Sequence, residues 1–274
     1  MMFVHIEKSA GTSFKSILIN NFFLSFLNLT SWHYKTNKDE KILKPKEIKN
    51  LLRIFPYAKA ISSHSRRPNF GYEKEVNRNI NYVTILRDPV ERYLSQYNFE
   101  KNVMEMGWDF KSFLGNERFN NFIVKKLTGE NNLKKAKKII DDFFFVGFVE
   151  EFDKSLILLR NKMQDSFNIN YQKRRVNSAK KYDKYADGLT TEQLDAVKKN
   201  NKLDIELYNY AYNKFEEELN KIPKLDELEM EFKNKNQSYE FPKWKKKIFK
   251  IYRKVYYRHI EKVINRIYHG PPTK

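Results

Sequence analysis

Residues 3–14 read FVHIEKSAGTSF and constrain the fold more than any other stretch of the chain. The apolar run Phe3–Ile6 predicts a short buried strand, the next residues a tight turn, and Thr12 the start of a helix. Backbone N–H groups in the first turn of a helix lack intrahelical partners and carry the positive end of the helix dipole. Lys8, Thr12 and Ser13 add a cation and two hydroxyls, so the stretch predicts a site for phosphate or sulfate.

The loop differs from the Walker nucleotide loop. In GxxxxGK[ST] the lysine follows a glycine and opens the helix, whereas Lys8 stands three residues before Gly11. This spacing disfavours an ATPase or a kinase. An ordinary strand-to-helix turn, in which Thr12 or Ser13 caps the helix, is the alternative interpretation.

A second stretch, residues 82–97 (YVTILRDPVERYLSQY), repeats the arrangement. The β-branched and aromatic run Tyr82–Leu86 predicts a strand, and Pro89 fits the first turn of a helix. Arg87 at the strand end could bind a phosphate through two N–H groups. An Arg87–Asp88 pair that only fixes the loop is the alternative.

Together the two stretches resemble the sulfotransferases that use 3′-phosphoadenosine 5′-phosphosulfate (PAPS), in particular the heparan sulfate 2-O-sulfotransferase-like branch and the bacterial-type sulfotransferase family 2. Residues 5–14 match that family's HIPKTAGTSF, with Glu7 in place of proline and Ser9 in place of threonine. The RDPxxRxxSxY motif is present in full at residues 87–97. Glu7 puts a carboxylate beside an anion site, which is unfavourable unless its side chain points away.

The resemblance implies a binding site for PAPS and for its product PAP. The 5′-phosphosulfate would be held by the first loop, which consists of Lys8, Ser9, Ala10, Gly11, Thr12 and Ser13. The 3′-phosphate would be held by Arg87 and Ser95. Further cofactor contacts are expected in the basic loop 171–181, at Arg174, Arg175, Asn177 and Ser178, although basic loops are common in a chain this charged.

A general base is expected at His64. Residues 57–63 (YAKAISS) predict a strand that delivers His64 to the carboxyl edge of the sheet, where open α/β sheets bind ligands. An imidazole can accept a proton near neutral pH, and the related enzymes have a histidine at the end of a strand between the two motifs. A structural histidine is the alternative. His33 is the next candidate for the base, and His5, inside the first strand, is expected in the core.

The acceptor side is expected in the loop after His64. Arg66, Arg67 and His33 are the candidate substrate-binding residues, although solvated loop charges are a simpler reading of each arginine. The mechanism implied is in-line displacement at sulfur, with His64 as base, while Lys8 and the amides of residues 10–13 stabilise the developing charge. No metal is required, because the chain itself supplies the cations.

The pattern of elements predicts an α/β fold. We expect a P-loop-like three-layer arrangement with a central, mostly parallel sheet flanked by helices. Residues 12–27 are expected to form one helix, and the run 143–149 (FFFVGFV) a buried strand. The sulfotransferase domain would span residues 1–222. Residues 223–274 would form a linker and a basic amphipathic helix over 243–269.

Charge and composition limit the partners. The chain has 274 residues, a formal charge of +19 and no cysteine, so disulfides and thiolate metal sites are excluded and an acidic partner is implied. A carbohydrate or glycolipid acceptor is expected and nucleic acid is not. A homo-oligomer is compatible, and the helix 243–269 could contact a membrane or pack on protein.

The first residues of the chain indicate the cellular location that we expect for the protein. Residues 1–3 (MMF) lead directly into the first strand, with no basic region or cleavable apolar segment before it. We therefore expect a cytoplasmic protein, peripheral at the inner membrane face if the C-terminal helix binds lipid. A P-loop small-molecule kinase and a non-catalytic binder of acidic polymer are the alternative functions.

Overall fold

The computed structural model describes residues 1–29, 44–64, 71–164, 166–172 and 188–269. Within them, five strands form a parallel sheet in the order β2-β3-β1-β4-β5. The strands are β1 (Met2–Val4), β2 (Phe26–Asn28), β3 (Ala60–Ser63), β4 (Tyr82–Leu86) and β5 (Phe145–Phe148). The predicted α/β fold with a central parallel sheet is confirmed.

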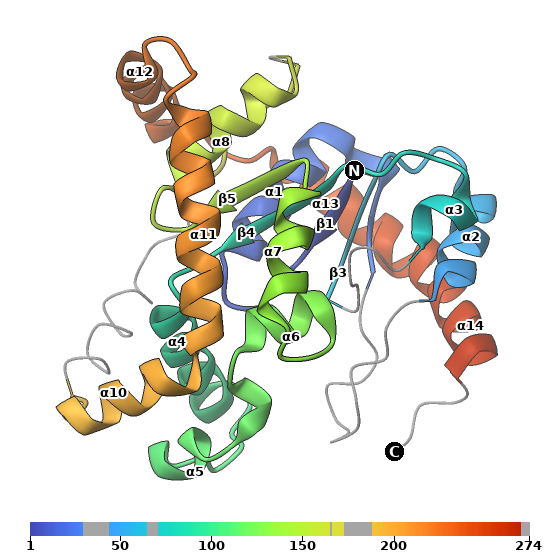
Figure 1. Ribbon diagram of the computed structural model, residues 1–274. Helices are drawn as coiled ribbons and strands as arrows, with labels where there is room; N and C mark the ends of the chain where they lie inside the picture. Colours follow the sequence, from blue (N-terminus) through green and yellow to red (C-terminus); the bar gives the residue numbers. More distant parts are fainter. Residues whose placement is uncertain (30–43, 65–70, 165, 173–187, 270–274) are drawn as a thin grey trace.

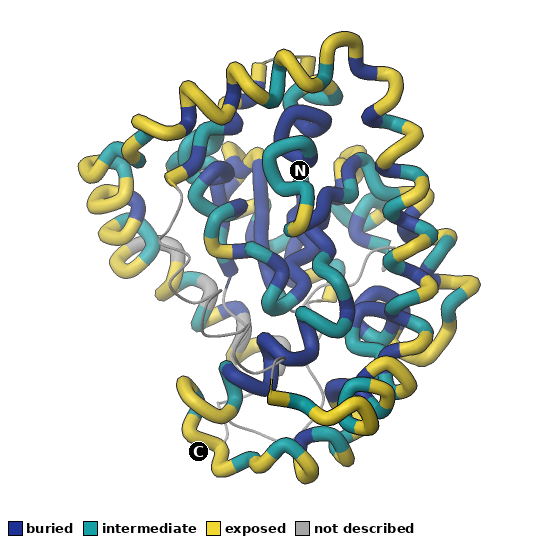
Figure 2. Tube along the Cα trace, turned by 90° about the vertical axis from the view of Figure 1, so that its left-hand side faces the viewer, coloured by how far each residue is buried: buried dark blue, intermediate teal, exposed yellow. Residues whose placement is uncertain are grey.

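The first strand occupies the middle of the sheet. Phe3 lies opposite Ser62 of β3 on one side and opposite Val83 of β4 on the other. The hydroxyl of Thr84 donates a hydrogen bond of 2.9 Å to the carbonyl of Val4 and adds a side-chain link between the two strands. Figure 2 shows the buried residues concentrated in the sheet and its adjoining helix faces, as expected for parallel strands covered on both sides.

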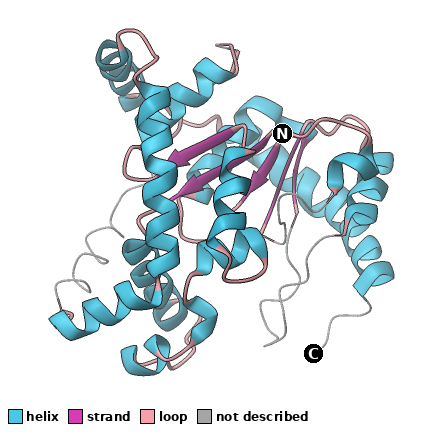
Figure 3. Ribbon diagram, in the orientation of Figure 1, coloured by secondary structure: helices cyan, strands magenta, loops and turns pink. Residues whose placement is uncertain are grey.

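Helices enclose the sheet (Figures 1 and 3). In Figure 1, α6, α7 and α11 cover one face, and α1 and α13 cover the other. The α-helices up to residue 219 are α1 (Gly11–Phe22), α2 (Pro45–Ile54), α3 (Tyr72–Val76), α4 (Pro89–Asn102), α5 (Phe110–Leu114), α6 (Phe122–Thr128), α7 (Leu133–Asp141), α8 (Phe152–Lys162), α10 (Thr191–Asn200) and α11 (Lys202–Leu219). Short 3-10 turns occupy Phe23–Ser25 and Glu117–Phe119.

One predicted helix is shorter than expected. The helix predicted over residues 12–27 ends at Phe22, and Phe26–Asn28 instead form β2, which pairs with β3. Phe23 has φ 43°, a left-handed conformation that a helix cannot continue through. The apolar run hid this break, because a helix and a buried strand both accept apolar residues at consecutive positions.

The C-terminal part of the chain is helical and packs on the rest. It comprises α12 (Leu225–Gln237), α13 (Lys243–Ile251), a π-helical turn (Tyr252–Tyr257) and α14 (Arg258–His269). The ring of Phe249 stacks on Phe26 of β2 with centroids 5.9 Å apart. Among the described residues, no helix combines the length and the apolar composition needed to span a bilayer.

Candidate active site

The sheet order brings the three predicted site segments together. His64 follows β3, Glu7 and Lys8 follow β1, and Arg87 follows β4, and these are three neighbouring strands. Because all pairs are parallel, their carboxyl ends lie at one edge of the sheet, where open α/β sheets bind ligands. The two motifs and the candidate base therefore share one edge, as the sequence predicts.

The loop after β1 has an unusual backbone. Lys8 (φ 68°) and Ala10 (φ 49°) take left-handed conformations that residues with side chains rarely adopt, which stores strain in the loop. Gly11 does not have a positive φ, so the reason for a glycine here is the lack of room for a side chain. A Cβ atom there would lie 1.7 Å from Nε2 of His5. The glycine lets the buried His5 ring pack directly under the start of α1.

Several donors of this loop have no partner. Among the described residues, none accepts a hydrogen bond from the backbone N–H of Gly11 or Thr12, and the buried hydroxyl of Ser9 is also unpartnered. The amide of Ser13, by contrast, donates to the carbonyl of Ala10 at 3.0 Å. The unpartnered donors of the loop therefore lie within residues 9–12.

Lys8 reaches toward the second motif. Its ammonium lies 4.4 Å from the ring centroid of Phe99 on α4. Burial, together with the positive charges of Arg87 and Arg92, lowers the pKa of Lys8 to about 8 against the opposing effect of Glu100. Cations from β1 and β4 are thus close enough to repel one another, an arrangement that a bound anion would relieve.

Arg87 is only partly paired. Its Nη2 lies 3.0 Å from a carboxylate oxygen of Glu91, one turn along α4, while its buried Nε has no partner among the described residues. Asp88 caps α4 by accepting from the amide of Glu91 at 2.9 Å. The alternative Arg87–Asp88 pair is therefore not formed. Ser95, the other predicted 3′-phosphate contact, is buried in α4 with 2% exposure.

Arg92, a further residue of the RDPxxRxxSxY motif, lies under the site. Its side chain is fully buried, with the guanidinium carbon 4.4 Å from the Phe122 ring centroid. Burial lowers the pKa of Arg92 to about 10, although the carboxylates of Asp204 and Glu7 favour the charged form. Its Nε and Nη1 lack partners among the described residues. A buried arginine with unpartnered donors adds positive potential to the site from below.

Glu7 links the candidate base to a lysine from another element. One of its carboxylate oxygens lies 3.0 Å from Nδ1 of His64 and 3.0 Å from Nζ of Lys126. The ring of His64 in turn lies against that of His5, with centroids 3.9 Å apart. Burial alone would raise the pKa of Glu7, but Lys126 and His64 outweigh it and hold that pKa below its ordinary range. The Lys126 ammonium therefore offsets the charge of this carboxylate, so Glu7 does not repel an anion as a free charge would.

The predicted core position of His5 is confirmed. Its side chain is buried, and burial lowers its pKa well below the ordinary value, with the nearby charge of His64 acting in the same direction. His5 is thus neutral near pH 7 and supports the ring of His64.

Lys126 is held in place by a capping arrangement. Asp204 of α11 accepts hydrogen bonds of 2.8 Å from the amides of Ile123 and Val124 in the first turn of α6. Asn121, just before that turn, accepts from the amide of Leu203 at 2.9 Å. These contacts fix the start of α6 against α11, and α6 carries Lys126 to the site with its side chain 3% exposed.

Several predicted site residues lie outside the described residues, and the structure gives no account of them. These are His33, Arg66, Arg67, Arg174, Arg175, Asn177 and Ser178.

Sequence reasoning missed Lys126 and assigned Glu7 no function. Lys126 is 119 positions from Glu7 along the chain, and no local motif marks it. The sequence already marked Glu7 as a carboxylate beside an anion site, and that alone indicates that a cation should lie nearby.

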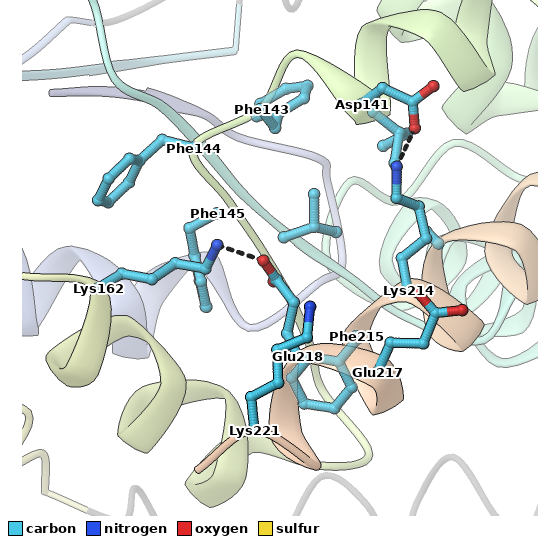
Figure 4. Close-up of a pocket in the computed structure, with 13 residues that line it drawn as sticks. Asp141, Phe143, Phe144, Phe145, Lys162, Lys214, Phe215, Glu217, Glu218 and Lys221 are labelled. Carbon is cyan, nitrogen blue, oxygen red and sulfur yellow. Dashed lines mark hydrogen bonds and ion pairs between the residues drawn. The ribbon is translucent and has the colours of Figure 1, made fainter.

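A separate pocket, shown in Figure 4, lies away from this edge. It surrounds the amino end of β5, at Phe143–Val146, and is lined by α7, α8 and α11. Its lining contains two ion pairs, Asp141 with Lys214 and Lys162 with Glu218 at 2.5 Å, and also the side chains of Glu217 and Lys221. Because acidic and basic side chains are mixed in this lining, at the amino end of β5, the pocket does not resemble an anion site.

Comparison with known proteins agrees with this geometry. A family model described as "Sulfotransferase family" matches residues 1–211, which include β1, β3, β4 and every residue of the site described above. The chain is also 30% identical over 191 residues to an uncharacterized protein of Archaeoglobus fulgidus, an alignment that covers 60% of this chain and 72% of that protein. The match over most of the chain, together with the parallel sheet and its site, shows that this chain belongs to the sulfotransferase family.

Proposed function

We propose that this protein transfers a sulfuryl group from PAPS to a hydroxyl group of a carbohydrate, either a polysaccharide or a glycolipid. The observation that carries the proposal is the adjacency of β3, β1 and β4, which end in His64, the Lys8 loop and Arg87. A donor with two phosphate groups needs two cationic turns at one edge, and a hydroxyl acceptor needs a base beside them.

The residues present fit PAPS. The amides of Gly11 and Thr12, the hydroxyl of Ser9 and the Nε of Arg87 are donors without partners among the described residues. Ser9, Gly11 and the Nε of Arg87 are buried, and an unpartnered buried donor is unfavourable unless a ligand accepts from it. The loop donors and Lys8 would hold the 5′-phosphosulfate, and Arg87 with Ser95 would hold the 3′-phosphate. When bound, PAPS supplies the activated sulfuryl group.

His64 would accept the proton of the acceptor hydroxyl. Its Nδ1 faces the carboxylate of Glu7 at 3.0 Å, which leaves Nε2 as the nitrogen able to take a proton from the acceptor. Glu7 acts here as a positioning residue, because it fixes the orientation of the imidazole and favours its charged form once the proton has arrived. His5 supports the opposite face of the same ring.

Lys8 and the loop amides would stabilise negative charge on the departing phosphate. Loss of one preorganised donor at a developing charge typically costs about 2–4 kcal/mol of transition-state stabilisation. Lys8→Met should therefore lower turnover on the order of a hundredfold or more.

An acidic polysaccharide or a glycolipid headgroup suits the charge of the chain. With a formal charge of +19, the protein attracts anionic polymers over long range. We place the protein in the cytoplasm, where the PAPS pool and the cytoplasmic membrane leaflet would both be accessible.

A ligand panel in thermal unfolding tests the cofactor. PAP should raise the melting temperature of the wild-type protein, whereas ATP–Mg²⁺ and GTP–Mg²⁺ should not. Lys8→Met and Arg87→Met should each abolish most of the PAP shift. Lys198→Met, a change to an exposed lysine of α10 far along the chain from the motifs, is the matched control and should keep it. Stabilisation by ATP–Mg²⁺ but not PAP would overturn the proposal.

Transfer of labelled sulfate from PAPS to a panel of polysaccharides and glycolipids tests the base. His64→Ala should retain the PAP shift and lose turnover. Glu7→Gln should lower turnover less and should move the acidic limb of the pH–rate profile, because the charge beside the imidazole is gone. If His64→Ala turns over at the wild-type rate with the acceptor that the panel identifies, His64 is not the base.

A further inference from the structure

The C-terminal helices carry a row of exposed apolar side chains, here called the apolar stripe. Its members are Trp244 (58% exposed), Ile248 (43%), Ile251 (53%), Val255 (64%), Val263 (56%) and Ile267 (72%). Large aliphatic side chains scattered singly on a surface are ordinary, but six along one helical segment require an explanation.

The opposite side of the same segment is firmly packed. Phe249 and Ile264 are 5% and 6% exposed and belong to the main hydrophobic core. In addition, the hydroxyls of Tyr252 and Tyr57 lie 2.9 Å apart. The segment therefore already has its core-facing side, and the apolar stripe is a second apolar side that faces outward.

The π-helical turn keeps the stripe in line. A turn with i→i+5 bonds contains one extra residue, so the helix beyond it is rotated by about 100° relative to a continuous α-helix. Val263 and Ile267 then lie about 20° and 60° from Ile251 around the axis, instead of about 120° and 160°. The turn thus joins the apolar side chains of α13 and α14 into one stripe.

Positive charge borders the stripe. Residues 243–258 contain eight lysines and arginines and no acidic residue. Lys246, Lys247, Lys250 and Lys254 are exposed, and none of them forms an ion pair with the described residues. Apolar side chains flanked by unpaired cations on one helical surface are the pattern of an interfacial helix.

We propose that the apolar stripe and its basic border form a docking surface for a membrane that contains anionic lipid. The apolar side chains would enter the headgroup boundary while the lysines contact lipid phosphates. A second copy of the chain is the weaker occupant, because a twofold contact through this surface would bring the same row of unpaired cations against itself. The proposal does not depend on the proposed enzymatic function.

Flotation of the full-length protein with lipid vesicles tests the proposal. Vesicles of phosphatidylcholine with 30–40 mol% phosphatidylglycerol, as a rough starting composition, should bind the protein, and pure phosphatidylcholine vesicles should bind it more than about tenfold less. The triple variant Ile248→Ser, Ile251→Ser, Val255→Ser should also lose more than about tenfold in binding. Trp244 emission should shift to shorter wavelength on vesicle binding only when the stripe is intact.

Two matched variants make the result specific. Val103→Ser and Met230→Ser change side chains that are equally exposed (64% each) on other elements, and neither should alter vesicle binding. All variants should melt within a few degrees of wild type, because exposed side chains are changed.

Three outcomes would overturn the proposal. One is binding to anionic vesicles that survives the triple serine change, because the attraction would then be to charge alone. Another is that neither the wild-type protein nor the triple serine variant floats with the anionic vesicles. The third is a dimer, seen by analytical ultracentrifugation, that the triple change dissociates while vesicle binding is absent, since a second copy would then occupy the stripe.

Discussion

Replacement of Lys126 by methionine tests the buried charge cluster of the site. The Lys126 side chain is 3% exposed, and its ammonium lies 3.0 Å from the Glu7 carboxylate, which also faces His64. Methionine keeps most of the volume of the side chain and removes its charge. Glu7, with its side chain 15% exposed, would then be left in the protein interior with only His64 as a partner.

The expected loss follows from the asymmetry of buried ion pairs. Removing one partner of a buried pair typically costs about 3–5 kcal/mol of unfolding free energy, because the remaining charge is desolvated and unpaired. For a chain of this size the melting temperature should fall on the order of 10 °C. The double variant Glu7→Gln, Lys126→Met has no buried charge at this point and should recover most of the loss.

The pH dependence has a definite sign. In the wild type the pKa of Glu7 is held below its ordinary range, so its contribution to stability is present above the unfolded pKa of about 4.3 and is lost as the pH falls through the folded pKa. Without Lys126, burial raises the folded pKa. The difference in unfolding free energy between wild type and Lys126→Met should therefore grow as the pH rises from about 4.5 to 7, because the carboxylate of the variant must ionise without its cation.

Guanidinium unfolding followed by circular dichroism at pH 4.5 and pH 7 provides the measurement. Lys125→Met is the matched control, because Lys125 lies next to Lys126 on α6 but donates to the carbonyl of Glu117 at 2.5 Å and not to Glu7. It should cost at most about 1 kcal/mol, equally at both pH values. An equal loss for Lys126→Met at both pH values, with no recovery in the double variant, would refute the reasoning and reduce Lys126 to a packing residue.

Three further outcomes are expected. The affinity for PAP, measured by calorimetry, should be constant up to about pH 8 and should then fall as Lys8 loses its proton. The reason is that burial lowers the pKa of Lys8 to about 8. The variant Lys8→Met should show no such fall in affinity. Gly11→Ala should lower the free energy of chemical unfolding by about 1–3 kcal/mol and should also lower the rate of sulfate transfer. The reason is that the new Cβ would lie 1.7 Å from the His5 ring. An unchanged unfolding free energy would contradict that contact. Asp204→Asn should lower the unfolding free energy by about 1–3 kcal/mol, because asparagine has only one side-chain oxygen and the carboxylate uses one oxygen for each of two backbone N–H groups of α6. Hydrogen exchange at the amides of Ile123 and Val124 should become faster. Unaltered exchange at both amides would exclude the capping function.

The fold was largely predictable from short stretches of sequence. The runs that form β1, β3, β4 and β5 and most of the helices have local periodicity and capping residues, and the two motifs mark the strand-to-helix turns. The strand β2 was not predictable in this way, because its three residues gain their conformation from pairing with β3 rather than from their own pattern.

The site was predictable only in part. Lys8 and Arg87 carry their chemistry in motifs, and each was placed correctly at the end of its strand. The pairing of Glu7 with Lys126 depends on α6 lying beside the turn that follows β1, a contact between residues 119 positions apart. No pattern within one segment encodes such a contact, since it is decided by how separate elements stack.

The same division holds for the C-terminal helices. The sequence alone determined that residues 243–269 are amphipathic and basic, because apolar residues recur there at helical spacing. Which apolar side chains are buried was decided by tertiary structure. Phe249 and Ile264 fill spaces on the core, and the π-helical turn rotates the helix so that Val263 and Ile267 face outward beyond Ile251. Local sequence fixes the period of a helix, but its rotation against the core follows from the shape of the surface on which it packs.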